Sequence, residues 1–333
     1  MPLRIIFCGT PAFGLPSLKI LLADPEFRVE AVITQPDRPR GREQNLAPSP
    51  IKNGALAAAV QIYQPEKIKS PEAADFLRRI APDAIVIIAY GQIIPRGLLE
   101  IPRLGWINLH GSLLPRYRGA APIQRSILNG DNRTGLTTMK IDAGLDTGPI
   151  LEQLEMQIGA DETAPQLMAR MADAGAPLLI RTLRGLDSGN VQPIPQDNSL
   201  ATFAPPLKKE KGLIDWATPA SEIYNRIRAF DPWPGTYTHF RGRLCHIWGR
   251  PAQHAESTAS VEGAANAAHS GSPAISIAPE PGTIAENRGD IRVACGEGTW
   301  LRIEYLQPEG RKRMAAREFA NGARISSAER FAS

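Results

Sequence analysis

Cysteine is scarce in this sequence of 333 residues. The three cysteines, Cys8, Cys245 and Cys295, lie far apart, and no two of them form a CxxC pair. An odd number of scattered cysteines is typical of neither a disulfide framework nor a zinc site. The cysteine content therefore favours a reducing compartment.

Long apolar runs are also lacking. No run approaches the ~20 residues that a membrane-spanning helix needs, and the chain enters a strand-like segment at residues 3–7 without the pattern of a cleavable signal. We therefore expect a cytoplasmic protein with no membrane partner.

The glycine patterns lack the fingerprint of a nucleotide-binding loop. Residues 9–14 read GTPAFG, which is not GxGxxG and has no following Lys-Ser/Thr pair. This disfavours a nicotinamide-dependent oxidoreductase and favours a tight strand-to-helix turn. The formal net charge of +4 is compatible with a polyanionic partner without requiring one.

The first 205 residues alternate short apolar runs with longer helix-like stretches, as in parallel βαβ units. The expected strands span residues 4–8, 30–34, 84–89, 106–110, 135–141 and 149–156. The expected helices span residues 12–22, 51–60, 72–80, 121–128 and 164–186, the last interrupted at Pro177. We predict an α/β domain over residues 1–205 with a doubly wound, mostly parallel sheet.

A second, smaller domain is expected over residues 206–333, after a stretch rich in proline and lysine. Its apolar segments are short, strand-like and separated by turn residues, as in a small OB-like β-barrel. Residues 252–278 are dominated by Ala, Ser and Gly, so we expect a disordered insertion there.

Polar side chains mark the end of the expected strand at residues 106–110. With a period of two, Asn108 and His110 project to the same side of that strand. Ligands of open α/β sheets bind at this carboxyl edge. Asp146 lies in a glycine-flanked loop, and its carboxylate near His110 would fix the imidazole tautomer. An amide, an imidazole and a carboxylate together suit proton transfer and oxyanion stabilisation in acyl transfer. On spacing alone, however, ordinary turn chemistry also explains Asp142 and Asp146.

Longer motifs surround these residues. They are HGSLLPRYRG from His110, QPDRP from Gln35 and RAFDPWP from Arg228. With Asn108 and Asp146, they closely resemble the methionyl-tRNA formyltransferase family over residues 3–251 and 282–325. The Asn-x-His and Ser-Leu-Leu-Pro patterns are shared by formyltransferases that use 10-formyltetrahydrofolate. The resemblance therefore implies this folate co-substrate, a formyltransferase-type sheet and no metal.

The resemblance also implies roles for individual residues. The catalytic trio would be Asn108, His110 and Asp146. The folate would lie along a larger set of residues: Ala89, Tyr90, Gly91, Ser112, Leu113, Leu114, Pro115 and Asp142. Initiator methionyl-tRNA would be the acceptor and the RNA partner, with no DNA partner.

Two basic segments would contact that tRNA. One is the loop 37–48, with Arg38, Arg40 and Arg42, which departs from the family pattern at residues 43–45 (Glu-Gln-Asn). The other is near the C-terminus, where Arg311, Lys312 and Arg313 form a basic cluster that, without the resemblance, is more typical of a solvated surface.

Other functions remain open because formyltransferases differ in the acceptor of the formyl group. Glycinamide ribonucleotide formyltransferases resemble only the first domain. Sugar-nucleotide formyltransferases have a second domain but usually carry Asn-Trp where this chain has Gln124-Arg125. A formyltransferase acting on a UDP-amino-sugar and a non-catalytic RNA-binding protein are the alternatives.

Overall fold

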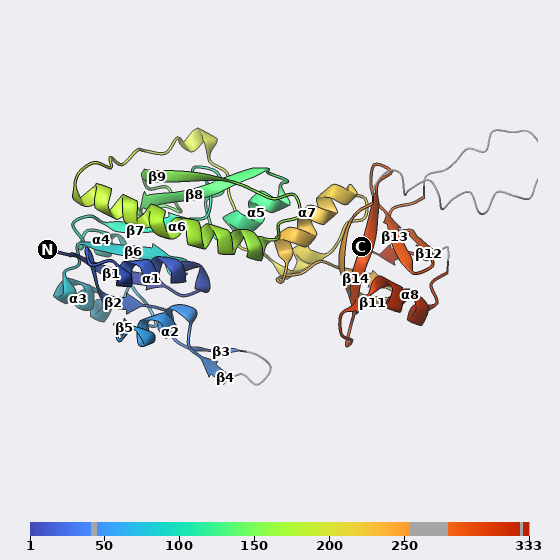
Figure 1. Ribbon diagram of the computed structural model, residues 1–333, viewed down its shortest axis with the longest axis horizontal. Coiled ribbons are helices and arrows are strands. Elements are labelled where there is room, and N and C mark those ends of the chain that lie inside the picture. Colours follow the sequence, from blue (N-terminus) through green and yellow to red (C-terminus); the bar gives the residue numbers. More distant parts are fainter. Residues whose placement is uncertain (41–44, 253–278, 327–328, 333) are drawn as a thin grey trace, which may run out of the picture. The chain divides into compact units, whose positions relative to one another are not determined.

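The computed structural model describes residues 1–40, 45–252, 279–326 and 329–332, which form two compact units (Figure 1). Unit 1 comprises Met1–Ile123, Asn132–Ala160 and Pro165–Pro206. Unit 2 comprises Gln124–Asp131, Asp161–Ala164 and Leu207–Ser333. Most of the chain thus divides once, after Pro206, and two short excursions join the second unit. The sequence patterns contained no sign of these excursions.

A seven-stranded sheet in the order β5-β2-β1-β6-β7-β8-β9 forms the centre of unit 1. The strands from β5 to β7 are parallel, and β8 and β9 are antiparallel. Their bounds are β1 Leu3–Gly9, β2 Phe27–Ile33, β5 Gln61–Tyr63, β6 Ala84–Ile88, β7 Trp106–His110, β8 Arg133–Lys140 and β9 Ile150–Gln157. All five residues of β6 are buried. Continuous burial of this kind is typical of a parallel strand covered on both faces.

Helices connect these strands. They are η1 Ala12–Gly14, α1 Leu15–Ala23, α2 Pro50–Ala57, α3 Pro71–Ile80, α4 Arg96–Leu99, α5 Pro122–Leu128 and α6 Ala164–Asp187, followed by η2 Asn198–Leu200. The starts of α2 and α3 follow from local sequence, because Ser49 and Ser70 accept hydrogen bonds from the backbone amides of Lys52 and Ala73. In both helices a proline occupies the first position, where no amide donor is needed.

Helix α6 is continuous, so the expected interruption at Pro177 is wrong. Proline removes one intrahelical hydrogen bond, but the residues on either side bury their apolar face. Ala176, Leu178 and Leu179 are at most 5% exposed. At Gly175 an added Cβ would lie 2.6 Å from a methyl group of Leu109, so the helix packs directly against β7. This packing outweighs the lost hydrogen bond.

Unit 2 is built on an antiparallel sheet in the order β12-β13-β14-β11-β10-β16, with β15 paired to β14. Its elements are η3 Lys209–Gly212, α7 Ala220–Phe230, β10 Tyr237–Phe240, β11 Arg243–Pro251, β12 Ile284–Asn287, β13 Asp290–Ala294, β14 Trp300–Pro308, β15 Met314–Ala315, α8 Ala316–Ala323 and β16 Phe331–Ala332. Trp216 stacks on Phe331 at the centre of its core, with ring centroids 5.8 Å apart. The predicted small barrel is confirmed, but helices α7 and α8 were not predicted.

Part of the expected loop 37–48 is a hairpin of two short strands, β3 Arg38–Arg40 and β4 Asn45–Ala47. Arg42 lies outside the described residues, as does the expected insertion from residue 253 to 278. In the part of the chain that the structure describes, no helix combines the length and the apolar character needed to cross a membrane.

Candidate active site

Strand β7 ends at His110, at the carboxyl edge of the parallel part of the sheet. The His110 side chain is 6% exposed, and its Nε2 lies 3.0 Å from the carbonyl oxygen of Tyr117. A carbonyl oxygen can only accept, so Nε2 carries the proton and donates it. Nδ1 is therefore the basic nitrogen of the ring. Asn108 is two residues earlier on the same strand, where the period of two places it on the same side as His110, and it is partly exposed.

The Asp146 carboxylate faces this basic nitrogen. Its Oδ2 lies 3.8 Å from Nδ1 of His110 and accepts a hydrogen bond of 2.8 Å from the backbone amide of Gly119. The distance to the imidazole exceeds a direct hydrogen bond. The Tyr117 carbonyl, rather than Asp146, therefore fixes the tautomer, which differs from the sequence-based expectation. Asp146 is instead placed to stabilise the ring once Nδ1 is protonated.

Asp146 is held in an unusual backbone conformation. Its φ is 50°, in the left-handed region that non-glycine residues seldom occupy. Within the same loop, Asp142 accepts hydrogen bonds from the Gly144 amide at 3.0 Å and the Thr147 hydroxyl at 2.7 Å. At Gly148 an added Cβ would lie 1.9 Å from the carbonyl oxygen of Lys140. The glycine-rich loop therefore passes close to β8, and its backbone presents Asp146 to His110.

The turn after β7 uses the side chain of Ser112 internally. Ser112 is fully buried and donates to the carbonyl of Arg116 at 2.6 Å. The Leu114 amide donates to the Thr137 hydroxyl at 3.1 Å, and that hydroxyl donates to the Ser112 carbonyl at 2.7 Å. The peptide bond from Leu114 to Pro115 is cis. Leu114 is 3% exposed, whereas Leu113 is partly exposed. Leu113 and Pro115 thus remain more available to a ligand than Ser112.

Residues 89–91 follow β6 at the same edge of the sheet. Ala89 and Gly91 have positive φ, 49° and 85°. The Tyr90 side chain is 2% exposed and packs in the core with Cys8, and burial raises its pKa well above the ordinary value. Its hydroxyl has no hydrogen-bond partner among the described residues. Tyr90 therefore offers a ligand its backbone, and its carbonyl already accepts from Gln35 Nε2 at 2.9 Å.

A polar network that the sequence analysis did not single out holds the base of the β3–β4 hairpin. Asp37 accepts from Lys52 Nζ at 2.5 Å and from Gln64 Nε2 at 3.0 Å. These two hydrogen bonds lower the pKa of Asp37. Gln64 Nε2 also donates to the carbonyl of Gln35 at 2.9 Å. The hairpin that carries Arg38 and Arg40 is thereby anchored beside the residues that follow β2.

The basic cluster expected to contact RNA lies in unit 2, between β14 and β15. Arg311, Lys312 and Arg313 are exposed. The Arg313 guanidinium carbon lies 4.3 Å from the ring centroids of both Trp248 and Tyr305. The aromatic rings thus hold one cation of the cluster in place by cation–π contact.

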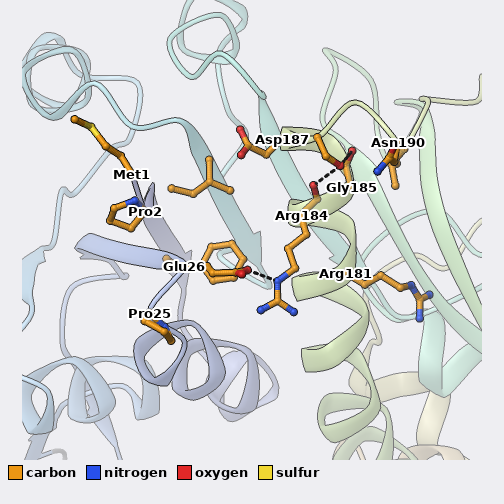
Figure 2. A pocket seen from close by; sticks show the side chains of 13 residues that line it. Met1, Pro2, Pro25, Glu26, Arg181, Arg184, Gly185, Asp187 and Asn190 are labelled. Carbon is orange, nitrogen blue, oxygen red and sulfur yellow. Dashed lines mark hydrogen bonds and ion pairs between the residues drawn. The ribbon is translucent and has the colours of Figure 1, made fainter.

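A broad depression of about 860 Å³ lies elsewhere on unit 1, beside the amino end of β1 and the end of α6 (Figure 2). Figure 2 shows Arg184 turned toward Glu26, and Arg184 also pairs with Asp24. Asp187 pairs with Arg103. None of the predicted site residues lines this depression. The arginine and carboxylate side chains that line it are each engaged in an ion pair.

Comparison with known proteins identifies the family. The model for the formyl transferase family matches residues 4–183, and that for the formyl transferase C-terminal domain matches residues 206–324. A protein of Solibacter usitatus named methionyl-tRNA formyltransferase is 49% identical over 330 residues, 99% of this chain and 98% of that protein. A protein of the same name from Geobacter sulfurreducens is 45% identical, over 99% of this chain and 96% of that protein.

Solved structures agree on the fold. The N-formyltransferase from Helicobacter canadensis, in complex with folinic acid and dTDP-3-aminofucose, aligns with a TM-score of 0.62 at 19% identity. The alignment covers 92% of this chain and 100% of that one. HypX from Aquifex aeolicus, in complex with tetrahydrofolic acid, aligns with a TM-score of 0.61 at 13% identity over 96% of this chain and 47% of that one. The predicted formyltransferase fold is confirmed. The chain belongs to the methionyl-tRNA formyltransferase family.

Proposed function

We propose that this protein transfers the formyl group of 10-formyltetrahydrofolate to the α-amino group of initiator methionyl-tRNA. The observation that carries the proposal is the convergence of His110 and Asp146, with Asn108 on the same strand, at the carboxyl edge of the sheet in a chain of this family. The products are N-formylmethionyl-tRNA and tetrahydrofolate, and the chemistry requires no metal. Translation initiation in the cytoplasm is the corresponding cellular role.

The acceptor amine needs little activation. A free α-amino group has a pKa near ~7.7, and the neighbouring ester lowers it further, so much of the amine is neutral at physiological pH. Its nitrogen attacks the formyl carbon, and the carbonyl oxygen becomes an oxyanion. The Asn108 amide can donate to that oxyanion, as acyl transfer requires. Binding both substrates in this geometry supplies a further part of the rate.

His110 transfers the proton, and Asp146 stabilises the protonated imidazole. Because Nε2–H is engaged by Tyr117, the lone pair on Nδ1 accepts the proton that the attacking nitrogen loses. The imidazolium so formed lies 3.8 Å from the Asp146 carboxylate, which stabilises it. Nδ1–H then returns the proton to N10 of the departing tetrahydrofolate as the tetrahedral intermediate collapses. One imidazole nitrogen thus serves as base and then as acid.

The folate lies along the same edge of the sheet in this proposal. The backbone of residues 89–91, the side chains of Leu113 and Pro115, and the Asp142–Asp146 loop provide its contacts. The positive φ of Ala89 and Gly91 turns the backbone sharply there. Ser112 and Leu114, which are buried, support the turn that carries the other contacts.

The tRNA is held by charge in both units. In this proposal Arg38, Arg40 and Arg42 contact the acceptor end of the tRNA. The exposed cluster Arg311, Lys312 and Arg313 contacts phosphates through the second domain. The cation–π contacts of Arg313 leave its charge on the surface while limiting the entropy lost on binding.

A competition between acceptors tests the function. Labelled 10-formyltetrahydrofolate is supplied with initiator methionyl-tRNA, a UDP-amino-sugar and glycinamide ribonucleotide together. We expect label in N-formylmethionyl-tRNA alone. Label in the amino-sugar would identify a sugar formyltransferase. Binding of tRNA without binding of folate would identify a non-catalytic RNA-binding protein.

A further inference from the structure

An irregular segment, residues 194–204, spans the two loops that carry the proposed catalytic groups. At one end Ile194 and Ile150 exchange two backbone hydrogen bonds of 2.8 Å, where the Asp146 loop enters β9. At the other end the Arg118 amide donates to the Thr202 carbonyl, and the Ala204 amide donates to the Arg118 carbonyl, both at 2.8 Å. The segment therefore ties the loop after β7 to the loop before β9.

Gln196 makes the side-chain connection between those loops. Its Nε2 donates to the carbonyls of Asp146 at 2.8 Å and Gly148 at 2.7 Å. Its Oε1 accepts from Nε of Arg118 at 3.0 Å and from Nη2 at 2.7 Å. A glutamine amide has two donor hydrogens and two acceptor lone pairs, so all four are used. No other residue type of this size can donate two hydrogen bonds to the Asp146 loop and also accept two from Arg118.

Arg118 is a buried cation whose described side-chain partners are amide oxygens. The residue is 4% exposed, and Nη2 also donates to Asn198 Oδ1 at 2.8 Å. Among the described residues, no carboxylate lies within ion-pair distance of its guanidinium. The charge polarises the Gln196 amide, which strengthens the hydrogen bonds that the same amide donates to the Asp146 loop. Arg118 also precedes Gly119, whose amide donates to the Asp146 carboxylate.

These contacts hold Asp146, whose backbone conformation is unfavourable by itself. Asp146 has a φ of 50°, which an isolated chain disfavours for a residue with a Cβ. One hydrogen bond from Gln196 fixes the Asp146 carbonyl, and one from Gly119 fixes its carboxylate. Both hydrogen bonds are connected to Arg118. Its guanidinium donates to Gln196, which holds the Asp146 carbonyl, and Gly119, the next residue in the chain, donates to the Asp146 carboxylate. We call these contacts among Arg118, Gln196, Gly119 and Asp146 the brace.

We propose that Gln196 and Arg118 are positioning residues, which hold the Asp146 carboxylate opposite Nδ1 of His110 during formyl transfer. The proposal rests on the proposed function for its kinetic consequences, although the brace itself can be measured without activity. Neither residue touches the reacting atoms. Their effect is expected on the chemical step and not on the binding of either substrate.

Kinetics of the full-length protein test the proposal with three variants. Gln196→Met keeps the length of the side chain and removes all four hydrogen bonds. A displacement of about 1 Å at a catalytic group costs about 10²-fold, so we expect kcat to fall by about 10- to 100-fold. The KM values for both substrates and the affinity for tetrahydrofolate should stay near those of the wild type. Gln192→Ala is the control, because Gln192 lies exposed just before this segment and, among the described residues, its side chain donates only to the Gly189 carbonyl.

Gln196→Glu supplies a readout that a merely structural role would not move. Ionised, the new carboxylate accepts from Arg118 but cannot donate to the Asp146 and Gly148 carbonyls. Beside the Arg118 guanidinium the carboxyl stays ionised through the neutral range. Gln196→Glu therefore keeps the contact with Arg118 and loses only the two donors to the Asp146 loop, so kcat should fall at every pH from 6 to 8 while the KM values for both substrates stay near those of the wild type. Gln192→Ala should change neither kcat nor the KM values.

The brace is also visible in the protein alone. The Gly119 amide resonance should shift, and its hydrogen exchange should quicken, in Gln196→Met but not in Gln192→Ala. An unchanged Gly119 amide, or wild-type kcat in Gln196→Met while the wild type formylates methionyl-tRNA, would overturn the proposal. If the wild type transfers no formyl group to methionyl-tRNA, the proposed function fails, and the Gly119 amide still decides whether the brace exists.

Discussion

At the scale of single residues, strand periodicity is a local pattern, so the sequence predicted that Asn108 and His110 lie on one strand, and both lie on β7. The pairing of His110 with Asp146 came from the resemblance to a family, since nothing in their spacing brings a loop 36 residues later in the chain to one imidazole. The role of the Tyr117 carbonyl in fixing the tautomer could not be predicted, because it depends on how the turn after β7 closes. Gln196 and Arg118 were missed for the same reason.

Substitution of Asn108 tests the oxyanion donor. Removing one such donor typically costs about 2.7–4 kcal/mol of transition-state stabilisation. We expect Asn108→Ala to lower kcat by about 10²- to 10³-fold, with little change in tetrahydrofolate affinity measured by fluorescence titration. Asn108→Asp should be no better than Asn108→Ala, because a carboxylate repels the oxyanion. A partly active Asn108→Asp variant would argue that this side chain does not face the reacting oxygen.

The three cysteines should be inert in the folded protein. All are buried, and burial raises the pKa of Cys245 and Cys295 to about 12 and that of Cys8 well above its ordinary value. The thiolate is the reactive form. A chromogenic disulfide reagent at pH 8 should therefore label none of them in the native protein and all three in guanidinium chloride. Rapid labelling of a folded sample would contradict the burial of that thiol.

At the scale of elements, the parallel strands β1, β2, β6 and β7 were predictable because strands covered on both faces form continuous apolar runs. The parallel strand β5 was missed, because it is only three residues long and none of them is fully buried. Helix α7 was missed although Ala220, Ile223 and Ile227 are spaced for one helix face, and all three are buried. Helix α8 has a similar pattern, with Ala316, Phe319 and Ala320 buried, but it is only eight residues long, so its periodicity is a weak signal. The continuity of α6 through Pro177 could not be predicted from propensity, because tertiary packing decides it.

The anchored hairpin gives a prediction at this scale. Lys52→Met removes the cation that holds Asp37 and should loosen the segment that carries Arg38 and Arg40. Losing a direct arginine contact to nucleic acid costs about 1 to 3 kcal/mol. Because Lys52→Met weakens these arginine contacts only indirectly, we expect a cost near the lower end of this range. The value of kcat/KM for methionyl-tRNA should therefore fall by up to about tenfold. Tetrahydrofolate affinity should not change.

The exposed Lys67 provides a matched control for this experiment. Lys67→Met removes the same charge without touching Asp37, and kcat/KM for methionyl-tRNA should stay near that of the wild type. Equal losses in the two variants would mean that total charge, and not the anchored hairpin, is what the tRNA senses.

At the scale of the whole molecule, the shift to short strand-like segments after residue 205 predicted a second domain, and such a unit is present. The short excursions of the chain into unit 2, at residues 124–131 and 161–164, could not be predicted, because they are defined by tertiary contacts and not by composition. Unit 2 has its own core and its own buried charges, so its stability has a pH dependence of its own.

The pKa of Asp290 determines the direction in which the stability of unit 2 changes with pH. Burial raises the pKa of its carboxyl, but hydrogen bonds and attraction from Arg302 and Arg292 outweigh burial and lower it overall. A lowered folded pKa means that the stabilisation is complete above the unfolded value of about 3.9 and is lost as the pH falls through the folded value. Asp290→Asn should therefore reduce the free energy of unfolding at pH 7, and this difference should shrink below pH 4.

Urea unfolding followed by tryptophan fluorescence measures this difference. Asp75→Asn, in an exposed pair with Arg78 on α3, is the control and should change the free energy of unfolding little at either pH. An Asp290→Asn deficit that stays constant or grows as the pH falls would mean that the two arginines do not stabilise the ionised carboxylate.

Single-turnover kinetics test whether His110 and Asp146 act on the formyl group during its transfer to methionyl-tRNA. Enzyme saturated with labelled 10-formyltetrahydrofolate is mixed with initiator methionyl-tRNA and quenched at intervals. We predict one formyl group transferred per active site in the wild type, and rates lower by about 10²-fold or more in His110→Ala and Asp146→Asn, with folate binding retained. Near wild-type single-turnover rates in either variant would contradict the account.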